Sequence, residues 1–187
     1  MKVIQLHLQE EKLLKRAKQN DRKAQQALYA QYAPKMLSVC RYYISNIYDA
    51  EETMLSGFFK VFTNIKNFKN EGSFEGWIRR IMIRESISFL RKKNPIIAVE
   101  EIEAYTEAVA CEMDVQAGVA AIQKAIDALP DGYKIVFNLY EIEGYKHQEI
   151  SEMLNISVST SKSQLFKAKK ALQTQLRSKK NRTNEIA

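Results

Sequence analysis

The chain has few of the residues that build metal sites and catalytic centres. It holds two cysteines and two histidines in 187 residues. Cys40 and Cys111 lie far apart in the sequence with no close second thiol, and each suits a buried apolar position in a reducing cytosol. His7 and His147 lack acids or thiols at ligand spacing, and there is no glycine-rich loop to cradle a phosphate. We therefore expect no metal, no cofactor, no small-molecule substrate and no enzymatic activity.

Long apolar segments are also missing. No stretch approaches the ~20 apolar residues that span a bilayer, and the first residues, MKVIQLHLQE, contain no continuous apolar core. These absences predict a soluble, cytoplasmic protein. Proline and glycine are scarce as well, with three and six residues, so the chain has few local breaks.

Apolar residues recur at intervals of three and four along most of the chain, and no segment has a convincing strand pattern. This period predicts an all-α fold. A chain of this length can bury two small cores, and we expect two small helical domains, at 10–93 and 118–176, joined by an acidic linker at 94–117. A basic tail follows at 177–187. Pro34 fits the first turn of a helix, so we also expect a helix break just before it.

The predicted linker differs in charge from the rest of the chain. It contains no lysine or arginine, and Pro95 ends the helix before it. Its acids are Glu100, Glu101, Glu103, Glu107, Glu112 and Asp114.

The whole chain is nevertheless basic, with 29 Lys and Arg against 22 Asp and Glu. Eight basic residues lie between Lys162 and Arg182, with no acid among them. Such clustering favours a polyanionic partner, either a nucleic acid or an anionic membrane surface.

The segment 146–172 has the layout of a helix-turn-helix. Asn155 suits a left-handed turn, and Ser157 can cap the second helix. That helix has a narrow apolar stripe, formed by Leu165, Ala168 and Leu172. Its opposite face carries groups that can reach phosphates and base edges, the amide of Gln164 being able to pair with adenine: Ser159, Thr160, Lys162, Ser163, Gln164 and Lys167. Short helical hairpins also occur in proteins that never touch DNA, but hydroxyls and cations together on one face favour DNA binding.

A second basic cluster lies in the first domain, where residues 79–93 contain six basic residues and one acid. Phe68, Phe74 and Trp77 flank a polar break at 67–73. Aromatic rings interleaved with cations suit a groove that holds a single strand and captures unpaired bases. Trp77 also fits a core position, whereas Phe68 and Phe74 lie outside the apolar stripe and are expected to frame a base pocket. The candidate contacts in this pattern are Phe68, Phe74, Trp77, Arg79, Arg80 and Arg84.

Both halves resemble the extracytoplasmic-function (ECF) sigma factors of bacterial RNA polymerase, over roughly residues 10–176. The first domain is similar to the family's second region in two runs, DAEETMLSGFFKVFTNIKNF and GSFEGWIRRIMIRESISFLRKK. The second domain is similar to the fourth region in the run ALPDGYKIVFNLYEIEGYKHQEISEMLNISVSTSKSQLFKAKKAL. The resemblance implies a sigma factor that binds core RNA polymerase and directs promoter recognition, melting and transcription initiation without catalysing a reaction itself.

The resemblance also implies where each partner binds. The helix that begins near Asp49 docks on a coiled coil of the largest polymerase subunit. The loop at 67–73 accepts a flipped base of the minus-ten element, and Arg79 and Arg80 grip the DNA backbone beside it. The loop residues implied in this contact are Asn67, Lys69, Asn70 and Ser73. The helix-turn-helix reads the minus-thirty-five element as duplex DNA, with Thr160, Lys162, Ser163, Gln164 and Lys167 facing it. The implied docking residues are Asp49, Glu52, Leu55 and Ser56, with Phe58 and Phe62 expected in the core.

Five residues depart from the family's usual pattern. Leu55 and Ser56 stand where relatives often have glutamine and an acid, which removes polar groups from the docking contact. Arg84 stands where asparagine is frequent and Gln164 where arginine is frequent, so promoter preference is expected to differ. Lys146 replaces the usual capping serine or threonine, which weakens that helix start by ~1 kcal/mol.

The resemblance further implies an anti-sigma factor, often membrane-anchored, that holds the protein inactive at the inner membrane until a signal arrives. Two other classes of function stay open. A stand-alone helix-turn-helix regulator would bind a palindromic site as a dimer, and a helical adaptor would bind protein alone, which the basic faces disfavour. A monomer that binds promoter DNA only together with core polymerase would exclude the dimeric regulator.

Overall fold

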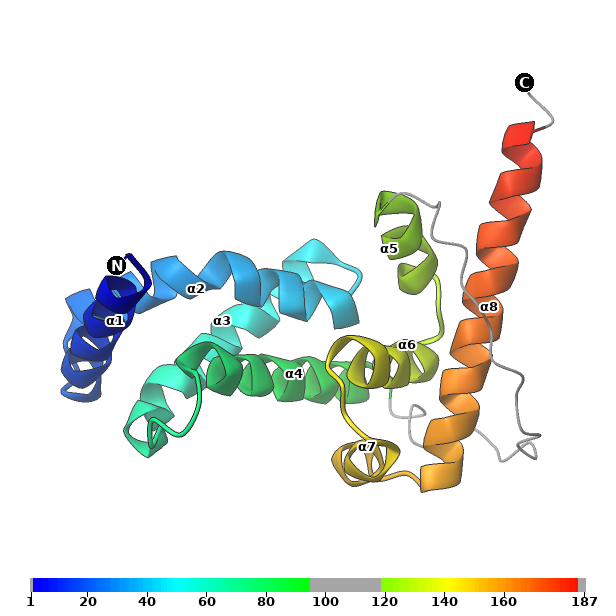
Figure 1. Cartoon of the computed structure of the whole chain (residues 1–187). Coiled ribbons are helices and arrows are strands. Elements are labelled where there is room, and N and C mark those ends of the chain that lie inside the picture. Colours follow the sequence, from blue (N-terminus) through cyan, green and yellow to red (C-terminus); the bar gives the residue numbers. More distant parts are fainter. Residues whose placement is uncertain (1, 95–118, 185–187) are drawn as a thin grey trace. The chain divides into compact units, whose positions relative to one another are not determined.

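Helices make up most of residues 2–94 and 119–184, which are the parts that the computed structural model describes; side chains are described for 9–94 and 122–176. No strand occurs within these residues, and the predicted all-α class is confirmed (Figure 1). The predicted acidic linker, 94–117, lies outside the described residues apart from its first position.

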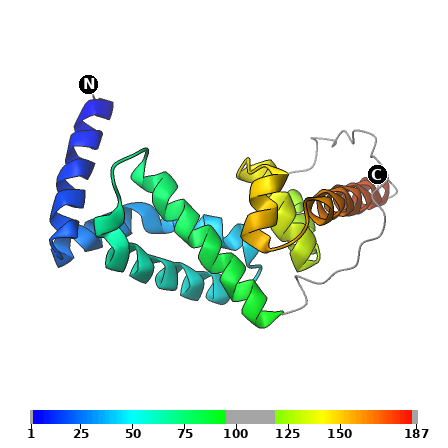
Figure 2. The same cartoon turned by 90° about the horizontal axis from the view of Figure 1, so that it is seen from below.

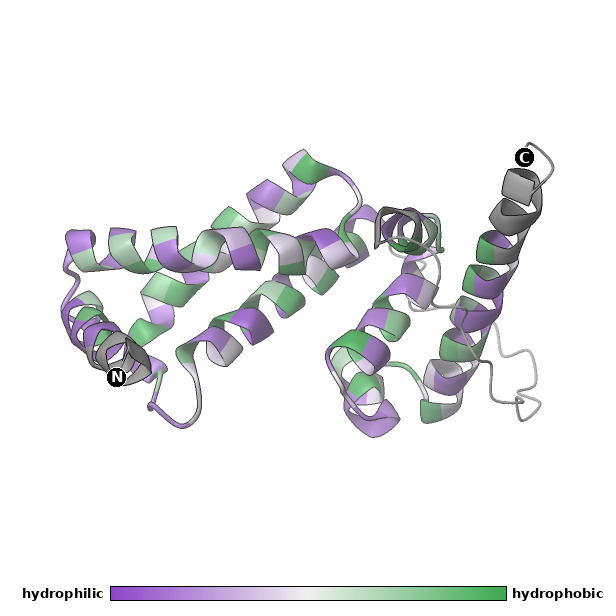
Figure 3. Cartoon of the chain, turned by 45° about the horizontal axis from the view of Figure 1, so that its top comes forward, coloured by the Kyte–Doolittle hydropathy of each residue, from purple (hydrophilic) through white to green (hydrophobic). Residues whose placement is uncertain are grey.

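The chain divides into two units near residue 89. In the first unit, α2 packs against both α1 and α3, and α1 lies at one end of α2 (Figures 1 and 2). Buried side chains recur at intervals of three and four residues along α3 and α4, so each helix buries one face. Figure 3 shows hydrophobic and hydrophilic residues alternating along the helices. The elements are α1 (Lys2–Lys18), α2 (Arg22–Tyr43), α3 (Ile47–Asn64), the 3-10 turn η1 (Ile65–Asn67) and α4 (Phe74–Lys93).

Polar side chains begin the helices of the first unit. Asp21 before α2 and Asn46 before α3 each accept two backbone N–H groups of the first turn, at 2.9 and 3.2 Å. Ser73 accepts the N–H of Gly76 at 3.0 Å at the start of α4. These bonds satisfy N–H groups that the helices themselves leave unpaired, so the sequence sets where each helix begins.

Pro34 lies inside α2, so the predicted helix break before it is wrong. A proline in a helix removes one backbone hydrogen bond and costs ~3 kcal/mol. The buried residues of α2 lie on both sides of Pro34, and their packing against α1 and α3 holds the helix together across it. They are Ala24, Leu28, Tyr32, Met36, Val39, Cys40 and Tyr43.

The core of the first unit is tightly packed. Cys40 is fully buried, as predicted, and burial raises the pKa of its thiol to about 11, so it stays protonated and unreactive. Cys111 lies outside the described residues. Gly57 brings α3 close to α4, because a Cβ added there would lie 2.4 Å from the Sδ atom of the fully buried Met82.

The second unit is built around α8. Helices α5, α6 and α7 each pack against α8, and the core includes Ile135, Leu139, Ile150 and Leu172. The elements are α5 (Val119–Asp127), α6 (Asp131–Phe137), the π-helical turn η3 (Asn138–Ile142), α7 (His147–Leu154) and α8 (Val158–Asn184).

The backbone of α8 continues to Asn184, well past Leu176, where we expected a separate basic tail to begin (Figure 1). The reason is local. The segment after Leu172 contains no proline or glycine and is rich in glutamine, lysine and arginine, which favour the helical conformation. The second unit therefore ends in a helix that extends beyond α5, α6 and α7.

Candidate nucleic-acid interface

The turn between α7 and α8 has the predicted helix-turn-helix geometry. Asn155 adopts the left-handed conformation, with φ 55° and ψ 47°, and the N–H of Ile156 donates to the carbonyl of Ser151 at 3.1 Å. The hydroxyl of Ser157 accepts the N–H of Thr160 at 2.9 Å, so Ser157 caps α8. Both predicted roles, the left-handed turn at Asn155 and the cap at Ser157, are confirmed.

At the start of α7, where the usual capping hydroxyl is absent, a carboxylate of the first turn binds the backbone. The Glu149 carboxylate accepts the backbone N–H of Lys146 at 2.8 Å. This is the acidic half of a capping box. A negative charge in the first turn also suits the positive end of the helix dipole. Glu149 therefore replaces part of the stabilisation that Lys146 does not supply.

The buried side of α8 is wider than predicted. Leu165, Ala168 and Leu172 are buried, as expected, but Ser161 and Gln164 are buried with them. Gln164 is only 4% exposed, and its amide nitrogen would lie 3.3 Å from a Cβ added at Gly132 of α6. The prediction that Gln164 pairs with adenine is therefore wrong. Position 164 lies one turn from both 161 and 168, inside the arc of α8 that α6 covers.

The exposed side of α8 keeps the other predicted groups. Ser159 and Lys162 are exposed, while Thr160, Ser163 and Lys167 are half-buried. Thr160 and Ser163 are partly engaged within the helix, since the Thr160 hydroxyl lies 2.8 Å from that of Ser157 and the Ser163 hydroxyl donates to the Thr160 carbonyl at 3.0 Å. Two further residues share this face and were missed in the sequence, although their spacing from Ser159 and Ser163 could have shown them: Phe166 and Lys170.

Replacing Lys162 with alanine is expected to weaken binding to the upstream promoter duplex and to lower the salt-dependence slope by about one, because one phosphate contact is lost. Gln164→Ala is the matched control on the same helix; its buried side chain should affect stability and leave the slope unchanged. Both variants are measured by titrating promoter duplex with reconstituted holoenzyme at several salt concentrations. A Lys162→Ala slope equal to that of the wild type would remove Lys162 from the DNA contact.

His147 ties the two helices of the helix-turn-helix together. Its Nδ1 atom lies 2.9 Å from the hydroxyl of the buried Ser161, and its ring stacks on that of Tyr140 with centroids 4.5 Å apart. Burial lowers the pKa of His147, and the charges of Lys162 and Lys169 lower it further. The imidazole therefore stays neutral at neutral pH.

The second unit is expected to lose stability as the pH falls below about 6.5, the ordinary pKa of histidine. The unfolded chain binds a proton at His147 more readily than the folded chain does, because the folded pKa is lowered. The contribution is fully present above that pH and is lost below it. Denaturant unfolding at acid and neutral pH, compared between the wild type and His147→Gln, measures the effect. Equal pH dependence in the two proteins would show that His147 is not its source.

The aromatic residues around the loop before α4 form a cluster. Phe68 and Phe74 are only 4% and 2% exposed, and their ring centroids lie 5.3 Å apart. Tyr32 contacts Phe74 from α2 at 5.6 Å, and Trp77 lies 5.5 and 5.7 Å from Phe68 and Phe74. The prediction that Phe68 and Phe74 frame a base pocket is therefore wrong, because both rings are packed in the core. Trp77 is half-buried and has an accessible part.

The loop that these rings support presents polar groups to solvent. Two residues have left-handed backbone conformations, Asn70 with φ 60° and Gly72 with φ 85°, so the chain reverses direction between η1 and α4. The predicted loop contacts are all exposed, and none of their side chains is needed for the core: Asn67, Lys69, Asn70 and Ser73.

The first part of α4 continues this surface. Spacings of three and four residues place Trp77, Arg80 and Arg84 on one face of the helix, and both arginines are exposed. Arg79 lies on a different side of α4 and is half-buried. The structure thus brings Trp77 together with Arg80 and Arg84, and separates Arg79 from them.

The outer face of α3 is unusually apolar. Leu55 and Phe59 are 55% and 74% exposed and lie one turn apart, with Glu52 and Ser56 exposed beside them. Asp49 is half-buried at the start of the helix. Phe59 was missed in the sequence because it follows Phe58, which is buried as predicted; the helical period separates two neighbouring rings by about 100°. Phe62, also predicted in the core, is half-buried.

Among the described residues, no helix is both long and apolar enough to cross a lipid bilayer. No group of three or more histidine, cysteine or acidic side chains among them is arranged to hold a metal ion.

Known protein families match two parts of the chain. Sigma-70 region 2 matches residues 28–96, and Sigma-70 region 4 matches residues 120–172. The first match covers the loop and the faces of α3 and α4, and the second covers the helix-turn-helix.

Individual proteins match over almost the whole chain. The ECF RNA polymerase sigma factor SigW of Bacillus subtilis is 30% identical over 179 residues, which covers 89% of this chain and 96% of SigW. The ECF RNA polymerase sigma-E factor of Haemophilus influenzae is 25% identical over 187 residues, covering 90% of this chain and 96% of that protein. The sigma factor RpoE of Bartonella quintana, solved with the anti-sigma factor NepR, has a similar fold, with a TM-score of 0.53 at 18% identity over 81% of this chain and 96% of RpoE.

Both sigma-70 regions occur in order in this chain, on a helical fold that carries the expected helix-turn-helix. The identity and coverage of the match to SigW extend the likeness across both units. The chain therefore belongs to the ECF family of RNA polymerase sigma factors, and it directs promoter recognition and transcription initiation.

Proposed function

We propose that the chain, while bound to core RNA polymerase, reads its promoter as duplex DNA through one unit and as a single strand through the other. The observation that carries this proposal is the presence of three separate surfaces of different chemistry: the apolar face of α3, the aromatic and cationic face of α4 with its loop, and the hydroxyl and cation face of α8. We assign the first two surfaces to a domain at 10–93 and the third to a domain at 118–176.

The face of α8 contacts the minus-thirty-five element. Ser159 and Lys162 are exposed, and Thr160, Ser163 and Lys167 flank them. A hydroxyl can read either a donor or an acceptor on a base edge, whereas a lysine either contacts phosphate or reads guanine. Because Gln164 is buried, the hydroxyl and lysine side chains of this face are left to read base edges, and the short hydroxyl side chains must approach the groove closely to do so.

The loop before α4 and the face of α4 capture the melted minus-ten element. Asn67, Lys69, Asn70 and Ser73 surround the expelled base, Trp77 stacks beside it, and Arg79, Arg80 and Arg84 attract the backbone. Binding of the unpaired strand pulls the melting equilibrium toward the open state. No covalent step is involved, so the protein acts by binding alone and is not an enzyme.

The face of α3 docks on core polymerase. Asp49, Glu52, Leu55 and Ser56 contribute to this contact, and Phe59 joins them at its centre. Burial of the exposed Leu55 and Phe59 side chains against a partner removes apolar surface from water, which favours association. Apolar burial here offsets the polar groups that Leu55 and Ser56 do not provide.

An anti-sigma factor is the third partner that we propose. RpoE of Bartonella quintana was solved in complex with the anti-sigma factor NepR, and CnrH, with a TM-score of 0.50 to this chain, was solved with the cytosolic domain of CnrY. A comparable inhibitor would cover the polymerase-docking surface and keep this protein in the cytoplasm or at the inner membrane.

Reconstitution tests the proposed function. The purified chain is added to core RNA polymerase, and transcripts are mapped on a genomic fragment that lies upstream of its own gene. We expect transcripts with defined start sites that require the chain. Specific DNA binding as a dimer without polymerase would instead support a stand-alone regulator, and a lack of any start-site selectivity would contradict the proposal.

A further inference from the structure

Lys18, at the end of α1, contacts the start of the loop that we assign to the minus-ten element. Its ammonium group donates a hydrogen bond to the Phe68 carbonyl at 2.6 Å, across 50 positions of sequence. The same ammonium lies 5.6 Å from the centroid of the Phe68 ring. Lys18 is half-buried, so both contacts form partly out of water, where a charged donor binds a carbonyl more strongly.

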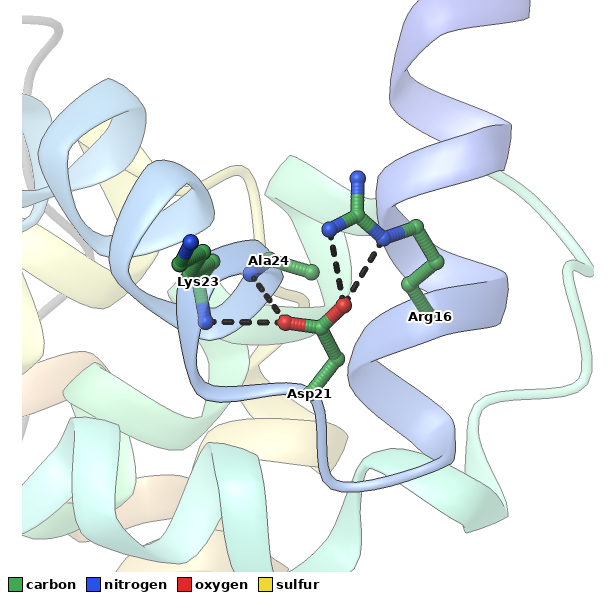
Figure 4. A network of polar contacts seen from close by, with 4 residues as sticks. All are labelled: Arg16, Asp21, Lys23 and Ala24. Atoms are coloured by element: carbon green, nitrogen blue, oxygen red, sulfur yellow. Dashed lines mark hydrogen bonds and ion pairs between the residues drawn. The ribbon is translucent and has the colours of Figure 1, made fainter.

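The end of α1 is held in place by a separate polar network (Figure 4). One oxygen of Asp21 caps α2 through the N–H groups of Lys23 and Ala24. The other accepts two bonds from Arg16, at 2.8 and 2.7 Å. The bond from Arg16, followed by that from Ala24, lowers the pKa of the Asp21 carboxyl. Because α1 is joined to the start of α2 in this way, the direction of Lys18 toward the loop is set by the fold.

Phe68 joins the buried aromatic cluster to the exposed loop. Its ring is buried between Phe74 and Trp77, so it cannot itself touch a base. Its backbone leads directly into the exposed residues 69–73. A bond to its carbonyl therefore fixes where the loop leaves the core. Lys18 also lies before residue 28, where the match to Sigma-70 region 2 begins.

We propose that Lys18 is a positioning residue for base capture: it holds the Phe68 carbonyl so that the loop is already in the conformation that accepts an unpaired base. The inference rests on the proposed function of this loop. Without the bond, part of the binding energy for the single strand is consumed in ordering the loop. Lys18 acts through Phe68 and makes no contact with DNA.

The test uses holoenzymes reconstituted with Lys18→Met, Lys18→Arg and Lys15→Met. Methionine keeps much of the length of the side chain but removes the donor, arginine keeps a charged donor, and Lys15 is an exposed lysine on the same helix. Each holoenzyme is assayed for assembly, for binding to the upstream duplex, and for binding to a single-stranded minus-ten oligonucleotide. We expect Lys18→Met to bind the oligonucleotide about tenfold more weakly, the usual effect of losing a charged hydrogen bond. Assembly and duplex binding should not change, and Lys18→Arg should regain most of the affinity.

The salt dependence of oligonucleotide binding separates positioning from direct contact. A positioning residue leaves the slope unchanged, whereas a lost phosphate contact lowers it. A lowered slope in Lys18→Met would therefore overturn the proposal, and so would an affinity equal to that of Lys15→Met. An equal loss in assembly and in both DNA assays would show that Lys18 only stabilises the fold. Failure of the proposed function is distinct, since the wild-type holoenzyme would then give no specific transcripts.

Discussion

Holoenzyme assembly is expected to weaken by about 30-fold when Phe59 is replaced with alanine, which corresponds to about 2 kcal/mol at an interface hot spot. Phe59 is 74% exposed on α3, so its ring contributes little to folding. Alanine also has the highest helix propensity. The variant should therefore unfold at the same denaturant concentration as the wild type while it fails to compete for core polymerase.

The measurement is a competition assay in which labelled wild-type protein is displaced from core polymerase. Lys60→Ala is the control, because Lys60 is the next residue on α3 and is exposed. Its ion pair with Glu85, at 2.6 Å, joins an exposed lysine to a glutamate whose side chain is 15% exposed, so its loss is expected to cost about 1 kcal/mol of stability. If Phe59→Ala and Lys60→Ala assembled equally well, the apolar face of α3 would not be the docking surface.

Stability of the first unit is expected to fall by about 3–5 kcal/mol when Phe74 is replaced with alanine, the usual cost of removing a buried phenylalanine ring. Phe74 is 2% exposed and contacts Tyr32, Phe68 and Trp77. A loss of this size is a large part of the total stability of a small domain. Promoter melting would be lost along with the fold.

Denaturant unfolding followed by Trp77 fluorescence measures the effect in the first unit, which contains the single tryptophan of the chain. Phe74→Leu, which refills most of the space, should recover most of the stability. Trp77→Ala provides the contrast. Because the Trp77 ring is only half-buried, its removal should lower stability less than Phe74→Ala does, and it should weaken single-strand binding directly. The unfolding of this variant is followed by circular dichroism. Normal stability of Phe74→Ala together with lost melting would mean that the ring faces DNA.

The helical period in the sequence was enough to predict the fold class, the helix-turn-helix and the buried stripe of α8. These features are local, since a turn residue such as Asn155 and a cap such as Ser157 act on backbone groups only a few positions away. The family resemblance that the sequence showed was confirmed by the matches to both sigma-70 regions.

The wrong predictions concern residues whose burial or helical conformation depends on packing between elements. Gln164 lies at the edge of the apolar stripe of α8, and only the position of α6 shows that it is covered. Phe68 and Phe74 flank a loop, where no period tells a core ring from an exposed one. Pro34 stays within a helix because buried side chains on both sides of it offset its local cost.

The close approach of α3 to α4 makes the order of substitutions at positions 57 and 82 matter. With Met82 in place, a side chain at position 57 would meet its sulfur at 2.4 Å, so a lineage that first enlarged Gly57 would pass through an overpacked ancestor. A smaller residue at position 82 removes that obstacle, and Gly57 can then change. Once it has, a methionine at position 82 would have to move its flexible end to fit, so the effects of substitutions at the two sites are expected to be non-additive.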